Sequence, residues 1–265
     1  VVAPDAPGVD PPRAGDGRGC AVTWRIDEGD CMDLLRALPD ASVHALVTDP
    51  PYVSVSGGNA NGRTSSGDSQ FYAFWLRSVM AELRRVLRPD ACGFVFCDWR
   101  TVGIVEAAAQ GRDRFTGDAW GVSQALVWDR EAIGLGSPFR NSFEMIAFMR
   151  GPKWASELAK DIRTVLRFRY PYGRHEHHPA EKPVDLVRQL VEWAAPEGGV
   201  VLDPFAGSGT TGVAAIQGGR GFIGMEIDPD TRAVALRRLR QAEAGGRTGP
   251  PILLPTEGGN FELPW

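Results

Sequence analysis

The feature that most constrains the fold is an apolar run, Val43 to Thr48, that stops at the tetrapeptide Asp49-Pro50-Pro51-Tyr52. A near-continuous apolar run of this length is typical of a parallel strand that is buried on both faces of a sheet. Neither proline can extend the strand, because each lacks an N–H group and has a fixed φ. The tetrapeptide is therefore predicted to form a turn at the end of a central strand.

This turn places a carboxylate, an outward carbonyl and an aromatic ring close together. Asp49 and the Pro50 carbonyl can form a paired acceptor for a planar exocyclic NH2 group, and Tyr52 can stack on the ring that carries it. We therefore predict that Asp49, Pro50, Pro51 and Tyr52 are catalytic residues of a site that holds a planar amino group.

A second turn follows the apolar segment Val200 to Leu202. It reads Asp203-Pro204-Phe205-Ala206-Gly207-Ser208-Gly209-Thr210-Thr211-Gly212 and leads into an Ala-rich segment, which predicts strand, glycine turn and helix. Gly207 and Gly209 permit positive φ and a close ligand approach, and the start of a helix favours an anionic group. The next apolar strand ends at Glu226, roughly 20 residues beyond the glycines, where an acid that binds ribose hydroxyls is usual.

The periodicity of apolar residues alternates along the chain between strand and helix. Predicted strands cover 22–26, 43–48, 92–97, 122–128, 145–149, 200–202 and 222–226, and predicted helices cover 31–38, 71–87, 101–110, 184–195 and 231–243. Such alternation indicates an α/β fold with a doubly wound, mostly parallel sheet. The strands 122–128 and 145–149 are expected to form an antiparallel hairpin at its edge.

With 265 residues the chain suits one domain, predicted over 21–245. Residues 1–20 are expected to be a disordered arm, 53–70 a mobile loop, 151–177 an insert and 246–265 a tail. No apolar stretch approaches the roughly 18 residues of a membrane span. The four cysteines form no C-x-x-C pair, which favours reduced thiols in a cytoplasmic protein.

The net charge of −4 argues against a uniformly basic nucleic-acid-binding surface, but it leaves room for a local basic face. His175, His177 and His178 cluster, yet no fourth ligand has suitable spacing, so no metal site is predicted. Gly207-x-Gly209-x-x-Gly212 also fits a nicotinamide oxidoreductase. Against that alternative, only one strand and one helix follow, and the Asp-Pro-Pro-Tyr turn has no role in hydride transfer.

Several further motifs stand in a characteristic order. They are Gly29-Asp30, Glu144-Met145-Ile146 with Arg150-Gly151, His178-Pro179-x-x-Lys182-Pro183, and Phe222-Ile223-Gly224-Met225-Glu226. With the two turns, they make residues 22 to 240 resemble the S-adenosylmethionine-dependent DNA amino-methyltransferases of the permuted beta class.

The resemblance implies a seven-stranded Rossmann-like sheet with an antiparallel strand, and S-adenosylmethionine as the methyl donor. It implies that Glu226 binds the ribose, that Asp30 with Cys31 binds the adenine end, and that Lys182 lies near the methionine end. Asp203 is expected either to orient the glycine turn or to meet the donor's ammonium group. The remaining implied donor contacts are Phe205, Gly207, Ser208, Gly209 and Thr210.

The family also places target recognition at the insert, where basic and aromatic residues alternate. Arg163, Arg167, Arg169 and Arg174 are the predicted DNA contacts, interleaved with Trp154, Phe168, Tyr170 and Tyr172; a solvated face is the alternative.

The implied activity is methylation of an exocyclic amino group on a base flipped out of double-stranded DNA. Adenine N6 is favoured because the cytosine N4 enzymes more often carry Ser at the position of Asp49; cytosine N4 is the alternative. An RNA or protein-amide methyltransferase, a nicotinamide oxidoreductase and a catalytically silent DNA-binding relative are less favoured. The partners to be expected besides DNA are a second copy of the chain and a cognate restriction enzyme.

Overall fold

The computed structural model describes residues 23–52, 69–112, 119–134, 138–156, 158, 160–170 and 181–245. The arm predicted over 1–20, nearly all of the loop predicted over 53–70 and the tail over 246–265 lie outside these residues. So do Arg174 and the histidine cluster.

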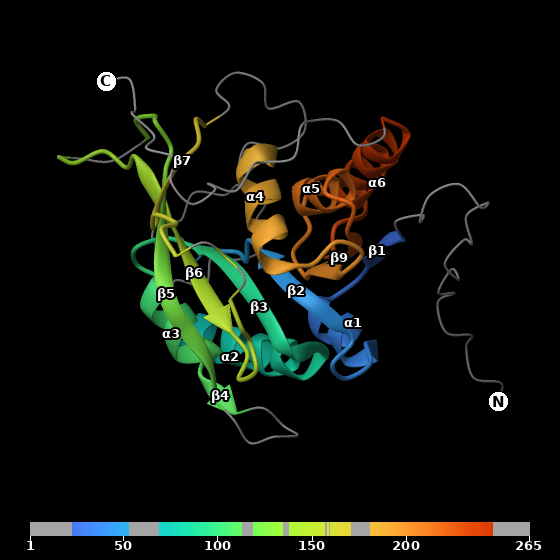
Figure 1. The fold of residues 1–265 in the computed structure, drawn as a ribbon, viewed down its shortest axis with the longest axis horizontal. Coiled ribbons are helices and arrows are strands. Elements are labelled where there is room, and N and C mark those ends of the chain that lie inside the picture. The colour runs from blue at the N-terminus through green and yellow to red at the C-terminus, as the bar shows by residue number, and fades with distance from the viewer. Residues whose placement is uncertain are drawn as a thin grey trace.

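The described strands form one mixed sheet (Figure 1). Its order is β1-β9-β8-β2-β3-β6-β5-β4, with β7 paired to β5. The strands are β1 (Trp24–Glu28), β2 (Val43–Thr48), β3 (Leu87–Cys97), β4 (Gly111–Arg112), β5 (Ala119–Asp129), β6 (Phe143–Arg150), β7 (Val165–Arg167), β8 (Val200–Asp203) and β9 (Gly221–Glu226). Neighbours from β1 to β3 pair in parallel, whereas β6 is antiparallel to β3 and β5.

This arrangement confirms the doubly wound, mostly parallel sheet with an antiparallel hairpin. All seven predicted strands are present in the path from β1 to β5. Two additional strands, β4 and β7, have two and three residues and are too short to show a period in the sequence. They pair with β5, so the hairpin is not the bare edge of the sheet.

Six helices in the described part of the chain cover the two faces of the sheet (Figure 1). They are α1 (Cys31–Ala37), α2 (Ser69–Val86) and α3 (Val102–Ala109) on one face, and α4 (Val184–Ala194), α5 (Thr210–Gln217) and α6 (Pro229–Ala244) on the other. Each layer has its own buried cluster, with Leu35 and Leu83 in the first and Leu190 and Leu239 in the second. None of the described helices combines the length and the apolar character that crossing a membrane requires.

Strand β3 begins at Leu87, earlier than predicted and directly after α2, although its third residue is Pro89. The pairing with β2 shifts register between Val43, opposite Leu87, and Ala45, opposite Cys92. Pro89 therefore sits in an irregular stretch where no ladder N–H is needed, and its carbonyl accepts from the Lys153 N–H at 3.0 Å.

The order of the strands places β2 beside β8 at the centre of the sheet. From β2 the chain continues outward to β3, whereas from β8 it continues in the other direction to β9, and the first strand, β1, lies beyond β9. Ligands of doubly wound sheets bind at such a reversal, outside the carboxyl ends of the strands. The turns after β2 and β8 are the two turns singled out in the sequence.

Candidate active site

The two turns meet although 155 positions separate them along the chain. Ala45 and Leu46 of β2 pair with Val201 and Leu202 of β8. At the ends of these strands, the Thr48 hydroxyl donates to Asp203 Oδ1 at 2.7 Å. The predicted amino-group site and the predicted donor turn thus share one edge of the sheet.

Asp49 projects from the end of β2 with 32% of its side chain exposed. The Tyr52 hydroxyl donates to its Oδ1 at 2.7 Å, and the Lys182 ammonium donates to its Oδ2 at 2.7 Å. Both oxygens of the Asp49 carboxylate therefore already accept a hydrogen bond from a side chain of the site. Of the prolines in this turn, Pro50 is buried and Pro51 is half-buried.

Lys182 is held between two carboxylates and is only 9% exposed. Its Nζ lies 2.7 Å from Asp49 Oδ2 and 3.1 Å from Glu144 Oε2. Burial by itself would lower the pKa of this ammonium, but Asp49 and Glu144 outweigh that effect, and the net pKa is raised. The side chain expected near the methionine end of the donor therefore lies against the predicted catalytic carboxylate.

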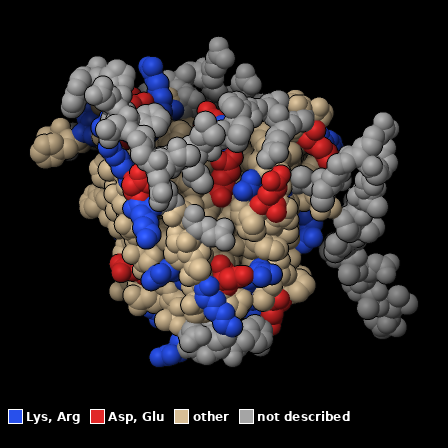
Figure 2. Space-filling model, in the orientation of Figure 1, with Lys and Arg blue, Asp and Glu red and all other residues tan. Residues whose placement is uncertain are grey.

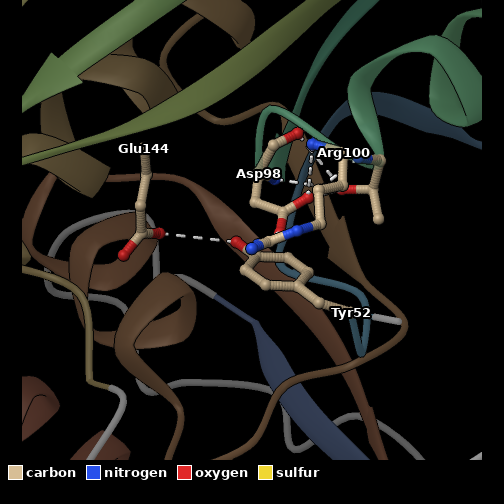
Figure 3. Close-up of polar contacts among 5 residues, drawn as sticks. Tyr52, Asp98, Arg100 and Glu144 are labelled. Carbon is tan, nitrogen blue, oxygen red and sulfur yellow. Dashed lines mark hydrogen bonds and ion pairs between the residues drawn. The ribbon is translucent and has the colours of Figure 1, made fainter. Parts of the chain in front are cut away.

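Glu144, at the start of β6, is a site residue to which the sequence assigned no role. Besides Lys182, it accepts from the Tyr52 hydroxyl at 3.4 Å (Figure 3). Burial, together with Asp49 and Glu144, raises the pKa of the Tyr52 hydroxyl well above its ordinary value, so Tyr52 remains a neutral donor. The signal was present in the matched segment Glu144-Met145-Ile146, but only the fold shows what Glu144 contacts.

A further turn follows β3, and Figure 3 draws its residues Asp98 and Arg100 above the Tyr52 ring. Asp98 Oδ1 accepts from the backbone N–H groups of Arg100 and Thr101 at 3.0 and 2.8 Å. The Arg100 guanidinium contacts Asp98 Oδ2 at 3.3 Å, and its Cζ stands 4.5 Å from the centroid of the Trp99 ring. This turn adds a half-exposed cation and an aromatic ring at the end of β3.

The glycine turn after β8 has the conformation that its residues require. Gly207 and Gly209 have φ of 51° and 85°, in the left-handed region that disfavours other residues. Glu226 closes the turn, since its Oε2 accepts from the Gly207 N–H and its Oε1 from the Asp228 N–H, both at 2.9 Å. The predicted ribose acid is therefore next to the predicted donor turn.

Arg238 of α6 braces the rest of this turn and was not predicted. Its Nη1 donates to the carbonyl and hydroxyl oxygens of Ser208, both at 2.8 Å, and to the Thr210 hydroxyl at 3.2 Å. Its Nη2 forms an ion pair with Glu181, one residue before Lys182. The helix that follows the turn is thereby tied to the segment that carries Lys182.

Asp203 is 3% exposed and lies beneath the turn. Its Oδ1 accepts from the Thr48 hydroxyl and, at 3.1 Å, from the Phe205 N–H. Burial raises the pKa of Asp203 to about 6, although these hydrogen bonds act in the opposite direction. The carboxylate thus hydrogen-bonds to the backbone of the turn. Its two predicted roles, orienting the turn and meeting the donor's ammonium group, stay predictions.

The residues expected at the adenine end lie at the neighbouring edge. Asp30 caps α1 by accepting from the Met32 N–H at 2.8 Å, and the Gly29 N–H donates to the Glu226 carbonyl at 3.0 Å. Cys31 is buried, and burial raises its pKa to about 12, so it is a neutral thiol. Phe205 packs against Trp75 of α2, with the ring centroids 5.6 Å apart and the ring planes tilted by 52°.

A cavity of about 160 Å³ joins the two halves of the site. It is lined by residues of both turns and of the segment before α4: Thr48, Asp49, Phe96, Glu181, Lys182, Val187, Asp203, Phe205, Ala206, Gly207, Ser208, Thr210 and Thr211. Among the residues that the structure describes, no group of His, Cys, Asp and Glu side chains could hold a metal ion.

The predicted recognition segment is described up to residue 170, apart from residues 157 and 159. Arg163, Arg167 and Arg169 are exposed, and Arg167 Nε lies 3.8 Å from Asp129 Oδ2. The aromatic residues behave differently, because Trp154, Phe168 and Tyr170 pack against the core. These three rings therefore support the segment rather than offering free faces to bases.

Residues 43–237 match the DNA methylase family that includes the N6 and N4 enzymes. The chain belongs to this family. The methylase is 32% identical over 229 residues to the Escherichia coli (strain K12) protein YubD, named as a methylase, covering 85% of this chain and 94% of YubD. It is 28% identical over 249 residues to the DNA adenine methyltransferase YhdJ of the same organism, covering 81% and 82%.

Among solved structures, the M1.HpyAVI–SAM complex matches 82% of the methylase and 98% of its own chain, with a TM-score of 0.63 and 22% identity. This likeness confirms the methyltransferase fold. Family membership identifies the activity as DNA amino-methyl transfer, on adenine N6 or cytosine N4.

Proposed function

We propose that the methylase transfers a methyl group from S-adenosylmethionine to N6 of an adenine that is flipped out of double-stranded DNA. The observation that carries this proposal is the position of the partly exposed Asp49 carboxylate, at the end of β2 and directly beside the glycine turn after β8. An acceptor for an amine and a turn suited to the donor share one cavity.

In the proposed step, the exocyclic amine is the nucleophile. Its lone pair is delocalised into the ring, and acceptance of its hydrogens by Asp49 and the Pro50 carbonyl favours a tetrahedral nitrogen. The nitrogen then attacks the methyl carbon, an N–C bond forms, the S–C bond breaks, and the sulfonium becomes a neutral thioether. The nitrogen becomes cationic and loses one proton, for which Asp49 is the adjacent anionic acceptor. Positioning and matched charges can supply on the order of 10 kcal/mol.

The donor's chemical groups match the order of residues along the edge. Glu226 is suited to ribose hydroxyls, and Asp30 with Cys31 to the adenine end, because the carboxyl ends of β1 and β9 are adjacent. Gly207, Ser208 and Thr210 line the cavity with backbone and small side chains, which leaves room for the methionine end of the donor. S-adenosylmethionine is also the ligand named for the M1.HpyAVI complex.

Adenine is favoured because the turn begins with Asp49, and because YhdJ is named as an adenine enzyme. Cytosine N4 is the alternative, since its amino group presents the same two hydrogens. The base must leave the duplex to reach Asp49, and Tyr52 can then replace the stacking that the base has lost.

DNA contact is proposed for the exposed Arg163, Arg167 and Arg169, which lie in and around β7 beside the hairpin. Figure 2 shows acidic and basic side chains interspersed over the visible face. Binding therefore depends on local groups of arginines rather than on a uniformly basic surface.

The test combines radiolabelled S-adenosylmethionine with DNA and, in a parallel reaction, with RNA from a host that lacks DNA methylases, followed by sequencing of the modified bases. Adenine N6 methylation at a defined site is expected; methylation only at cytosine N4 would overturn the choice of base, and label only in RNA would overturn the DNA substrate. Asp49→Ala is expected to abolish transfer while calorimetry still detects donor binding. Near-normal turnover of that variant would overturn the role of Asp49.

A further inference from the structure

Lys182 donates to Asp49 Oδ2, which is one of the two carboxylate oxygens that could accept from a substrate amine. Its ammonium lies 2.7 Å from Asp49 Oδ2, while the Tyr52 hydroxyl takes Oδ1 at 2.7 Å. Both oxygens of Asp49 already have a donor, and one of these donors carries a full positive charge. An ammonium–carboxylate contact is stronger than the contact that a neutral amine can offer. A target amine that competed directly with Lys182 would therefore be at a disadvantage.

Glu144 supplies Lys182 with a second carboxylate on the other side. Its Oε2 lies 3.1 Å from Lys182 Nζ, and the Glu144 side chain is only 16% exposed. Glu144 is held in place from its other side, where Arg130 Nη1 lies 3.7 Å from Oε1. Arg130 in turn stacks on Tyr170, with its Cζ 4.3 Å from the ring centroid. The second carboxylate therefore has a contact within the hairpin that does not involve Asp49.

We propose that Glu144 is a positioning residue that holds Lys182 when the target amine enters, so that Asp49 Oδ2 becomes free to accept the amine. Lys182 is then paired with both carboxylates before the amine enters, and with Glu144 alone once the amine has bound to Asp49. Without Glu144, release of Asp49 would leave a buried ammonium with no partner, which is strongly unfavourable. The inference rests on the proposed function, because it concerns the base that Asp49 receives.

The structure favours this role over a purely structural one because the Glu144 contacts lead to the reacting carboxylate. The same oxygen that accepts from Lys182 also lies 3.4 Å from the Tyr52 hydroxyl (Figure 3). Glu144 Oε2 therefore lies close to both groups that donate to Asp49, the Lys182 ammonium and the Tyr52 hydroxyl. If Glu144 served only to anchor the hairpin through Arg130, its removal would have the same effect whether or not Lys182 were present.

That difference defines a double-mutant cycle of Glu144→Gln, Lys182→Met and the double variant, measured as kcat/KM for DNA at saturating donor. In the wild-type background, Glu144→Gln is expected to lower kcat/KM about tenfold, because Lys182 then stays on Asp49. In the Lys182→Met background the same change is expected to cost less than about twofold or to raise the rate, since it removes one of two facing carboxylates. Calorimetry should show unchanged donor affinity for Glu144→Gln.

Asp185→Asn is the matched control. Asp185 is close to Lys182 in sequence, pairs with Arg188 within α4, and has a side chain that is 76% exposed. It should leave kcat/KM unchanged. Equal losses from Glu144→Gln in both backgrounds, or wild-type kcat/KM in the single variant, would overturn the inference while leaving the proposed function intact. Absence of methyl transfer by the wild-type chain would instead overturn the proposed function.

Discussion

The buried carboxyl group of Asp203 predicts how the stability of the methylase depends on pH. Burial raises its pKa from the ordinary 3.8 to about 6, and only 3% of the residue is exposed. The folded protein therefore binds this proton more tightly than the unfolded chain does. The contribution of Asp203 favours folding below pH 3.8 and is lost as the pH rises to about 6.

The size of this contribution follows from the two pKa values. A difference of roughly two corresponds to about 3 kcal/mol of unfolding free energy, present at low pH and absent at pH 7. Asp203→Asn removes the titrating group and keeps an oxygen for the Thr48 hydroxyl and the Phe205 N–H. If the new NH2 group lacks a hydrogen-bond acceptor, the unfolding free energy of the variant is lower by the same amount at every pH.

Urea unfolding of the wild type and of Asp203→Asn between pH 4 and 7.5 measures the difference directly. The variant should gain up to about 3 kcal/mol relative to the wild type over this range. Parallel curves for the wild type and Asp203→Asn would refute the argument that Asp203 is ionised at a cost in the folded protein.

Three further changes test the geometry of the site. Tyr52→Phe removes one donor from Asp49 and should lower kcat by less than about tenfold, with donor affinity unchanged in calorimetry; complete loss of activity would contradict this. Gly209→Ala should destabilise the fold by about 2 kcal/mol in urea unfolding, because φ is 85° and the new Cβ would lie 2.9 Å from Leu239 Cδ1. Gly198→Ala, with φ of 76° and no neighbour within 4 Å, measures the backbone part alone and should cost less. Arg238→Met should weaken donor binding about tenfold, because Ser208 and Thr210 lose their shared brace; an unchanged dissociation constant would exclude that role.

The sequence predicts the parts of this molecule that depend on neighbouring residues. Asp-Pro-Pro after an apolar run and Gly-x-Gly before an Ala-rich helix are local patterns, and both turns lie where they were expected. The contact between Glu144 and Lys182 joins β6 to the segment before α4. The local pattern of apolar residues in the sequence does not predict this contact. The same holds for Arg238, which reaches Ser208 from 30 positions away.

The recognition segment shows a second limit of sequence reasoning. Arginines interleaved with aromatic residues suggested one mixed binding face, but composition does not tell which side chains point inward. The pairing of β7 with β5 decides it: the Trp128 indole donates to the Phe168 carbonyl at 2.7 Å, and Phe168 turns toward the core. Of the predicted DNA contacts, the described Arg163, Arg167 and Arg169 are exposed.

Asp203 and Lys182 differ in a way that predicts how donor binding depends on pH. Lys182 is buried but paired with two carboxylates. By contrast, the groups that donate hydrogen bonds to Asp203 within the described part of the chain are neutral hydroxyl and N–H groups. If the ammonium group of S-adenosylmethionine meets Asp203, it supplies the missing positive charge and lowers the pKa of that carboxyl. Donor binding near pH 6 should then release a proton, and affinity should increase as the pH rises from 5 to 7.

Calorimetric titration in two buffers with different ionisation enthalpies measures that proton directly. The wild type should show a buffer-dependent enthalpy at pH 5.5, and Asp203→Asn should not. Equal enthalpies in both buffers for the wild type would mean that the ammonium group binds elsewhere, which leaves Asp203 with only its role in orienting the turn through the Phe205 N–H.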